Sequence, residues 1–146
     1  MNLFWDTSAV LALVLKDKHG KSAATQASKT GIQHVTTPLV ALEAENKLHA
    51  LIWKGEVERE AGHLSLVAME RFFASKLISV RNVKDTRLIA AEGRRMTRHF
   101  STERPHKTMD LIHVACARLL RADGFFTFDS NQSALAAAAG FIVKLT

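Results

Sequence analysis

Short apolar segments alternate with longer helical patterns along all 146 residues, and this alternation limits the folds open to the chain. Strands separated by helices cannot pair as hairpins, so they need crossover connections and form a parallel sheet that helices cover on both faces. The sequence therefore predicts an α/β fold. The five predicted strands are 2–5, 34–37, 77–80, 125–128 and 141–145.

Apolar residues at helical spacing predict seven helices between these strands. Pro38 suits a first helical turn, Gly55 and Gly124 suit helix ends, and Asp85 or Thr86 can cap the fifth helix. A polar, proline-containing loop is expected over 100–107. The predicted helices are 9–15, 22–29, 39–53, 56–74, 86–99, 108–121 and 130–139.

The composition is that of one packed domain, which we expect to span 1–146. Hydrophobic residues make up 47% and charged residues 23%, with only 7 Gly and 2 Pro, which excludes a disordered chain. The longest apolar run, 9–15, is far short of the roughly 20 residues that span a bilayer, and no basic residue precedes it as in a signal peptide. We therefore expect a cytoplasmic protein without membrane partners, in which the single Cys116 is a buried, reduced thiol.

Four acidic residues fall where such a fold gathers ligands. Asp6 and Asp129 each follow a predicted strand, and ligands of parallel sheets bind beyond the carboxyl ends of the strands. Asp110 lies in the first turn of an apolar helix, and Glu43 borders the apolar stripe of another. Taken singly, each has a structural alternative: Asp6 and Asp129 as helix caps, Asp110 as a partner of the helix dipole, and Glu43 as a solvated side chain.

Together, four carboxylates in one cleft would repel one another unless a cation compensated them, and oxygen ligands suit Mg²⁺ or Mn²⁺. The sequence has no HExxH or CxxC pattern for zinc, and its seven His show no ligand spacing. It also has no Gly-rich phosphate-binding loop and no GxSxG setting for a nucleophilic serine. A divalent cation bound by carboxylates is therefore the predicted centre.

The four acids lie in four segments of the chain: FWDTSA (4–9), LVALEAEN (39–46), MDLIHVA (109–115) and FTFD (126–129). In this order and spacing, the segments resemble the PIN-domain nucleases, and most closely the VapC toxins of type II toxin-antitoxin systems. The resemblance runs from about residue 2 to 145. It implies a PIN-like three-layer α/β/α fold with a central parallel sheet, and the activity of a small endoribonuclease.

The resemblance also implies roles for individual residues and partners. Asp6, Glu43, Asp110 and Asp129 would form the acidic Mg²⁺ site, and Asn131 stands where some family members have a further acid, which weakens the case for a second metal. The family usually forms homodimers and is inhibited by a VapB-like antitoxin whose tail occupies a groove beside the acids. Here the helices 39–53 and 56–74 are where we look for that groove. The residues implied to hold the carboxylates are Thr7 or Ser8, Asn46 and Thr127.

The chain is basic, with a net charge of +6, and nearly all of the excess lies between 81 and 107, where eight Lys and Arg face three Asp and Glu. Polyanions such as RNA attract such a surface, although a solvated helix face or a site for an acidic protein explains the charge equally well. The predicted mechanism is hydrolysis of an RNA phosphodiester by a metal-activated water in line with the 3′ oxygen. The expected RNA contacts are Arg87, Arg94, Arg95, Arg98, Arg104 and Lys107.

Three alternatives remain beside the nuclease. A catalytically inactive PIN scaffold that binds RNA or protein would not need all four acids together. A phosphorelay receiver needs adjacent acids after its first strand, and a haloacid-dehalogenase-like phosphatase needs a second Asp two residues after the first, where this chain has Ser8. His113, beside Asp110 on the same helix face, is interpreted as a packed hydrogen-bonding residue rather than a general base.

Overall fold

The computed structural model describes residues 1–100 and 104–144 and contains one parallel sheet. Its strand order is β3-β2-β1-β4-β5, and each neighbouring pair is parallel, which confirms the predicted α/β class. The central strand β1 therefore separates its two sequence-distant neighbours β2 and β4. The strands are β1 (Asn2–Trp5), β2 (Gln33–Thr36), β3 (Ser79–Val80), β4 (Gly124–Phe126) and β5 (Ile142–Lys144).

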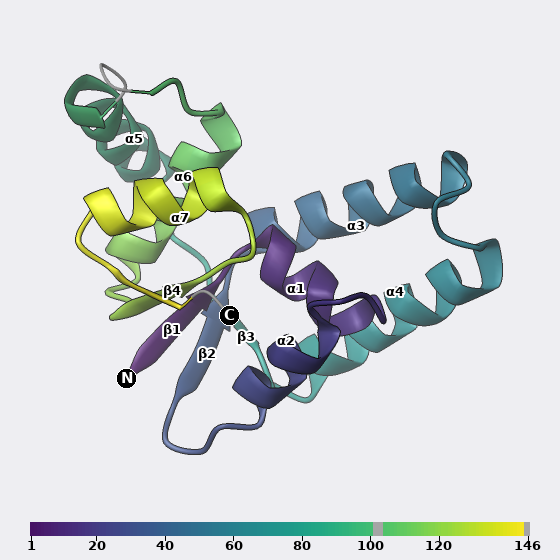
Figure 1. Ribbon diagram of the computed structural model, residues 1–146. Coiled ribbons are helices and arrows are strands. Elements are labelled where there is room, and N and C mark those ends of the chain that lie inside the picture. Colours follow the sequence, from purple (N-terminus) through teal and green to yellow (C-terminus); the bar gives the residue numbers. More distant parts are fainter. Residues whose placement is uncertain (101–103, 145–146) are drawn as a thin grey trace.

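Helices form the outer two layers of the three-layer arrangement (Figure 1). Helices α1 to α4 pack on one another, and α5, α6 and α7 form a second group on the other side of the sheet. Among the described residues, no helix has both the length and the apolar character that crossing a bilayer requires. The helices are α1 (Thr7–Val14), α2 (Gly20–Ala27), α3 (Pro38–Trp53), α4 (Arg59–Ala74), α5 (Thr86–Phe100), α6 (Thr108–Leu119) and α7 (Ser130–Ala138).

The core is built on the two central strands. Leu3, Phe4 and Trp5 of β1 are fully buried, as are Phe125 and Phe126 of β4, so both faces of these strands are covered. Phe4 pairs in register with Phe125, and their rings stack with centroids 5.2 Å apart. This packing fixes the carboxyl ends of β1 and β4 next to each other, which is where the first and last of the predicted acids follow.

The observed element bounds differ from the predicted ones at several places: α2 spans 20–27 instead of 22–29, α4 begins at 59 instead of 56, and β3 begins at 79 instead of 77. At the acidic edge, strand β4 ends at Phe126 instead of residue 128, and the side chain of the next residue, Thr127, bonds Asp6. Asp129 therefore does not follow the strand directly but lies at the N-cap of α7. Helix α1 already begins at Thr7, with Asp6 as its N-cap, two residues earlier than predicted. Part of the predicted loop, 101–103, and the end of the last predicted strand at 145 lie outside the described residues.

The structure confirms the prediction that Cys116 is a buried, unpaired thiol. The side chain is 1% exposed on α6, in the apolar layer between the helix and the sheet. Burial raises the pKa of its thiol to about 11, which keeps the sulfur protonated at neutral pH. Cys116 is thus a packing residue.

Candidate active site

Asp6 lies at the carboxyl end of β1, where it caps α1. Its backbone N–H donates to the carbonyl of Phe126 (3.2 Å), and its Oδ1 accepts from the Ala9 N–H (2.9 Å) and the Ser8 hydroxyl (2.8 Å). Thr127 donates its hydroxyl to Oδ2 at 2.5 Å. Burial nevertheless dominates and raises the pKa of Asp6 to about 6. The carboxylate is therefore held rigidly, in a setting that disfavours its charge.

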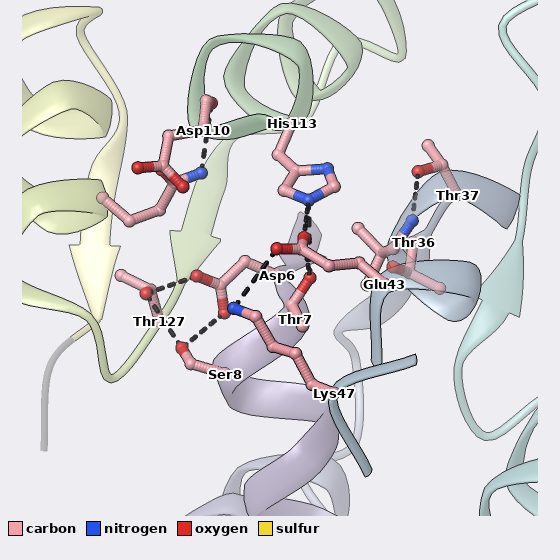
Figure 2. Close-up of polar contacts among 12 residues, drawn as sticks. Asp6, Thr7, Ser8, Thr36, Thr37, Glu43, Lys47, Asp110, His113 and Thr127 are labelled. Atoms are coloured by element: carbon pink, nitrogen blue, oxygen red, sulfur yellow. Dashed lines mark hydrogen bonds and ion pairs between the residues drawn. The ribbon is translucent and has the colours of Figure 1, made fainter. Parts of the chain in front are cut away.

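Glu43 enters the same site from α3, a helix that begins at Pro38 with Thr37 as its N-cap. Its Oε2 accepts from the Thr7 hydroxyl (2.6 Å) and contacts Nε2 of His113 (2.5 Å), while Nζ of Lys47 lies 3.2 Å from Oε1 (Figure 2). These contacts, with the His113 hydrogen bond foremost, lower the pKa of Glu43 to about 2. Glu43 is consequently an anion at every physiological pH.

His113 supports Glu43 from α6. Because Glu43 is ionised and accepts only, the Nε2 atom of His113 carries the hydrogen of their bond. The ring is 2% exposed, and its Nδ1 is buried without a partner among the described residues. This is the packed, hydrogen-bonding histidine that the sequence predicts.

Asp110 and Asp129 complete the acidic group from α6 and the N-cap of α7. Gln132 ties the two segments together: its backbone N–H donates to Oδ1 of Asp129 (2.9 Å), and its side chain donates to the carbonyl of Asp110 (3.2 Å). Burial raises the pKa of Asp110, and the negative charges of Asp129 and Glu43 raise it further. The carboxylates thus lie close enough for their charges to interact. Figure 2 shows Asp6, Glu43 and Asp110 around one space.

The structure places some of the predicted supporting residues in contact with the acids and others away from them. Thr7 holds Glu43, whereas Ser8 and Thr127 hold Asp6. Asn46 is exposed on α3, and the described contacts of the four acids do not include it. Asn131 is exposed as well, and its Oδ1 accepts from Nη1 of Arg104 (3.0 Å) instead of facing the carboxylates.

Two contributors were not predicted. Lys47 lies one helical turn after Glu43, and the i, i+4 spacing is the sequence signal that could have found it. Gln132 is 1% exposed and bonds both acidic segments, but no local pattern marks a glutamine for such a bridge. Both contribute contacts to the acids on which the site depends.

The residues fit a hard divalent cation by their chemistry. The donors are carboxylate oxygens, and the pKa of Asp110 is raised first by burial and then by the negative charges of Asp129 and Glu43, which a cation would relieve. Among the described residues, Thr7, Lys47 and His113 are the groups that donate to Glu43 or bring positive charge beside it. Within 1–100 and 104–144, however, no three Asp, Glu, His or Cys side chains gather tightly enough to hold a metal as they stand. The site therefore has the negative charge of a metal centre, but its described carboxylates are more widely spaced than the ligands of a bound cation.

The predicted arginine surface of α5 is partly neutralised. Arg87 donates twice to Asp85, and Arg95 donates twice to Glu92. Glu92 also pairs with Arg118 of α6 (2.7 Å), so it joins the two helices. Arg94 and Arg98 are exposed on α5, as are Arg104 and Lys107 before α6. Among the described residues, the cationic side chains of this surface that form no ion pair are therefore Arg94, Arg98, Arg104 and Lys107 rather than Arg87 and Arg95.

The chain is thus an α/β protein whose parallel sheet has carboxylates from four separate segments at its carboxyl edge. The model of the PIN domain matches residues 3–138, and the chain belongs to this family. A comparison with curated protein sequences found no match.

Two solved structures are similar over nearly the full chain. One is VapC20 of Mycobacterium tuberculosis, described as a sarcin-ricin loop cleaving toxin, with 26% identity, a TM-score of 0.67 and 96% of both chains covered. The other is VapBC-1 of nontypeable Haemophilus influenzae, with 14% identity, a TM-score of 0.64 and 99% of this chain and 97% of that chain covered. The second likeness bears on the fold alone. The predicted resemblance to PIN nucleases, and among them to VapC toxins, is confirmed.

Proposed function

We propose that this protein is a Mg²⁺-dependent endoribonuclease, active also with Mn²⁺, and the toxin of a VapBC-type pair. The observation that carries the proposal is the group of four carboxylates, from β1, α3, α6 and the start of α7, in a chain of the PIN family. The likeness to a toxin that cleaves the sarcin-ricin loop favours RNA as the substrate. An enzyme with this substrate would act in the cytoplasm.

Asp6, Glu43, Asp110 and Asp129 would hold the cation, which when bound activates a water and stabilises charge on the phosphate. Thr7 and His113 orient Glu43, and Ser8 and Thr127 orient Asp6, so these carboxylates keep fixed positions. One carboxylate would take the proton of the attacking water, and Asp6 and Asp110, whose pKa values burial raises, are the candidates. The leaving oxygen takes its proton from solvent.

We include an antitoxin and a second copy of the chain among the partners. An apolar groove of about 630 Å³ lies between α1 and α4, lined by residues that include Val14, Leu64 and Ala68. Leu64 is 68% exposed, and Trp53, at the end of α3, is 87% exposed. Exposed apolar side chains beside a groove favour a protein partner there. Homodimer formation rests on the family resemblance.

One observation favours a second candidate, a catalytically inactive PIN scaffold that binds RNA or protein. In the described part of the chain, the acids do not converge as a closed three-ligand site, and both carboxylate oxygens of Asp6 already accept hydrogen bonds. Such a scaffold would bind without cutting.

A cleavage assay separates the two candidates. Purified protein, free of antitoxin, is incubated with total cellular RNA and Mg²⁺ or Mn²⁺, with EDTA as the control. We expect discrete fragments with metal, none with EDTA, and at least about a hundredfold slower cleavage by Asp110→Asn, because a half-buried carboxylate is lost from the site. The matched variant is Asp123→Asn, at the opposite end of the sheet, where the amide oxygen still accepts from Asn2. Absence of fragments from folded wild type, or full activity of Asp110→Asn, contradicts the proposal.

Metal binding is expected to depend on pH through Asp6. The cation needs the ionised carboxylate, and the pKa of about 6 means that Asp6 is protonated in the metal-free protein below that pH. The apparent affinity for Mn²⁺ should therefore fall by up to about tenfold per pH unit below 6 and level off above 7. Titration followed by electron paramagnetic resonance at pH 5, 6, 7 and 8 measures this. Equal affinity at pH 5 and pH 7 would remove Asp6 from the metal site.

A further inference from the structure

We propose that a lysine surface around α2, formed by Lys18 before the helix, Lys21 in its first turn and Lys29 after its end (the α2 lysines), is a second RNA-binding surface that holds the backbone of the strand beyond the acidic site. This inference rests on the proposed function and adds to it a substrate contact that lies apart from the arginines of α5. It concerns the phosphate backbone and is independent of base sequence.

The three lysines line one hollow around α2, with Lys18 before the helix, Lys21 in its first turn and Lys29 after its end. All three are exposed. They line a polar hollow of about 350 Å³. From 16 to 30 the chain holds four lysines and a single acid, Asp17, whose carboxylate accepts from the backbone of His19. The hollow therefore carries an excess of positive charge.

Gln26 is the buried residue that lines the hollow. The side chain is 4% exposed, and its Oε1 accepts from Nζ of Lys29 (3.0 Å), which restrains that lysine. Its Nε2 is buried and has no hydrogen-bond partner among the described residues. An oxygen-rich ligand such as a phosphate backbone would supply the acceptors that this donor and the ammonium groups need.

A chain of contacts connects the hollow with the acids. The Ser8 hydroxyl donates to Asp6 and accepts from the backbone N–H of Phe128 (2.9 Å). The ring of Phe128 stacks on His19, with centroids 4.4 Å apart, and His19 directly follows Lys18. Both rings are half-buried, so their open edges can contact bases along the path. A strand that leaves the acidic site over Phe128 thus reaches the lysine surface.

This surface lies away from the predicted arginine surface. Figure 1 shows α2 beside α1, whereas α5 belongs to the helix group on the other side of the sheet. The guanidinium groups of Arg87 and Arg95 on α5 already form ion pairs with Asp85 and Glu92. An RNA strand that neutralises the lysines of α2 breaks no such ion pair, so its binding gains more from counterion release.

The chemistry favours RNA over a protein partner at this place. A peptide gains most of its affinity from apolar anchors in fitted pockets. The hollow is lined by lysine, hydroxyl and amide side chains, Lys18, Lys21, Ser22, Thr25, Gln26 and Lys29, whereas the apolar groove of the protein lies elsewhere, between α1 and α4. The ammonium groups are donors for successive phosphates, whereas the Thr25 hydroxyl already donates to the carbonyl of Lys21.

The test is the salt dependence of RNA binding in the absence of cleavage. A fluorescein-labelled, single-stranded RNA of 20 nucleotides and mixed sequence is titrated with full-length protein in EDTA, by anisotropy, from 50 to 300 mM KCl. For the Lys18→Gln/Lys21→Gln/Lys29→Gln variant, we expect the slope of log K against log salt to fall in magnitude by about 2, and binding at 0.1 M to weaken by roughly tenfold to a hundredfold. The matched control, Lys54→Gln/Arg59→Gln/Lys76→Gln, removes the same charge from exposed positions elsewhere and should keep both values.

A second readout uses the wild type alone. Bound RNA should slow acetylation of Lys18, Lys21 and Lys29 by an N-hydroxysuccinimide ester, relative to Lys54 and Lys76, as read by mass spectrometry. Equal losses in both triple variants, unchanged binding in the α2 variant, or no protection of the α2 lysines would overturn the inference. So would unchanged RNA binding with loss of binding to a polyglutamate peptide, which would assign the surface to an acidic protein.

The metal-dependent cleavage assay keeps the two proposals apart. If wild-type protein cuts RNA but its binding does not depend on the α2 lysines, only the surface is refuted. If binding depends on those lysines and no cleavage occurs with Mg²⁺ or Mn²⁺, the surface is supported and the nuclease proposal fails.

Discussion

Replacing Asp6 by Asn is expected to abolish RNA cleavage and, in the metal-free protein, to increase stability at pH 7. Asp6 is 3% exposed, and burial raises its pKa from 3.8 to about 6. The folded protein therefore binds a proton on Asp6 more tightly than the unfolded chain does, and the wild type loses stability as the pH rises from about 4 to 6. The loss approaches about 3 kcal/mol at pH 7, an order-of-magnitude figure that the neutral amide avoids.

The hydrogen bonds around Asp6 make asparagine a fair replacement. Its Oδ1 can still accept from the Ala9 N–H and the Ser8 hydroxyl, so the cap of α1 survives. The amide nitrogen replaces the oxygen that accepts from Thr127, and that hydroxyl can turn to accept instead. We therefore expect a net gain of about 1–2 kcal/mol at pH 7, after allowing for some repacking.

Urea unfolding in EDTA at pH 4, 5, 6 and 7 measures this prediction, with Asp123→Asn as the exposed control. The difference between Asp6→Asn and wild type should grow with pH and be smallest at pH 4, whereas the control should show no such trend. If Asp6→Asn were less stable than wild type at pH 7, the ionised carboxylate of Asp6 in the wild type would be better solvated than its burial indicates. Retained cleavage would exclude Asp6 from the chemistry.

The parts of this site that could be predicted from sequence depend on local patterns. Asp6 follows an uninterrupted apolar strand, and Pro38 with Thr37 marks the start of α3, which then fixes where Glu43 lies. Periodicity alone was enough to place these segments in a parallel sheet with covering helices. The carboxyl ends of neighbouring parallel strands meet at one edge, so Asp6 and Thr127 come together as a consequence of topology.

The parts that could not be predicted depend on tertiary contacts. Glu92 neutralises Arg95 on its own helix and also Arg118 on α6, and the second of these pairs joins segments that no spacing rule relates. The bond between His113 and Glu43 spans 70 residues. The bond of Thr127 to Asp6 likewise spans 121 residues, and local propensity does not encode it.

The second large effect is expected at His113. Substitution by Leu keeps an apolar side chain of similar bulk on α6 but leaves the ionised Glu43 without its buried hydrogen-bond donor. Loss of the donor to a charged acceptor costs about 1–3 kcal/mol, and we expect about 2 kcal/mol here, because Glu43 is 19% exposed and keeps its contacts with Thr7 and Lys47. With the hydrogen bond removed, the pKa of Glu43 should rise toward its ordinary value.

A double-mutant cycle of His113→Leu and Glu43→Leu isolates the pair, with all four proteins unfolded by urea in EDTA at pH 7. The cost of the double variant should be about 1–2 kcal/mol below the sum of the single costs, since Glu43→Leu removes the charge that His113→Leu leaves uncompensated. The matched cycle of His49→Leu and Glu45→Leu, an exposed pair on α3 with 3.8 Å between Nε2 and Oε1, should give about 0.5 kcal/mol or less. Equal coupling energies in the two cycles would mean that the His113 contact stabilises the protein no more than an exposed pair does. The position of Glu43 in the acidic site would then be set by α3 alone.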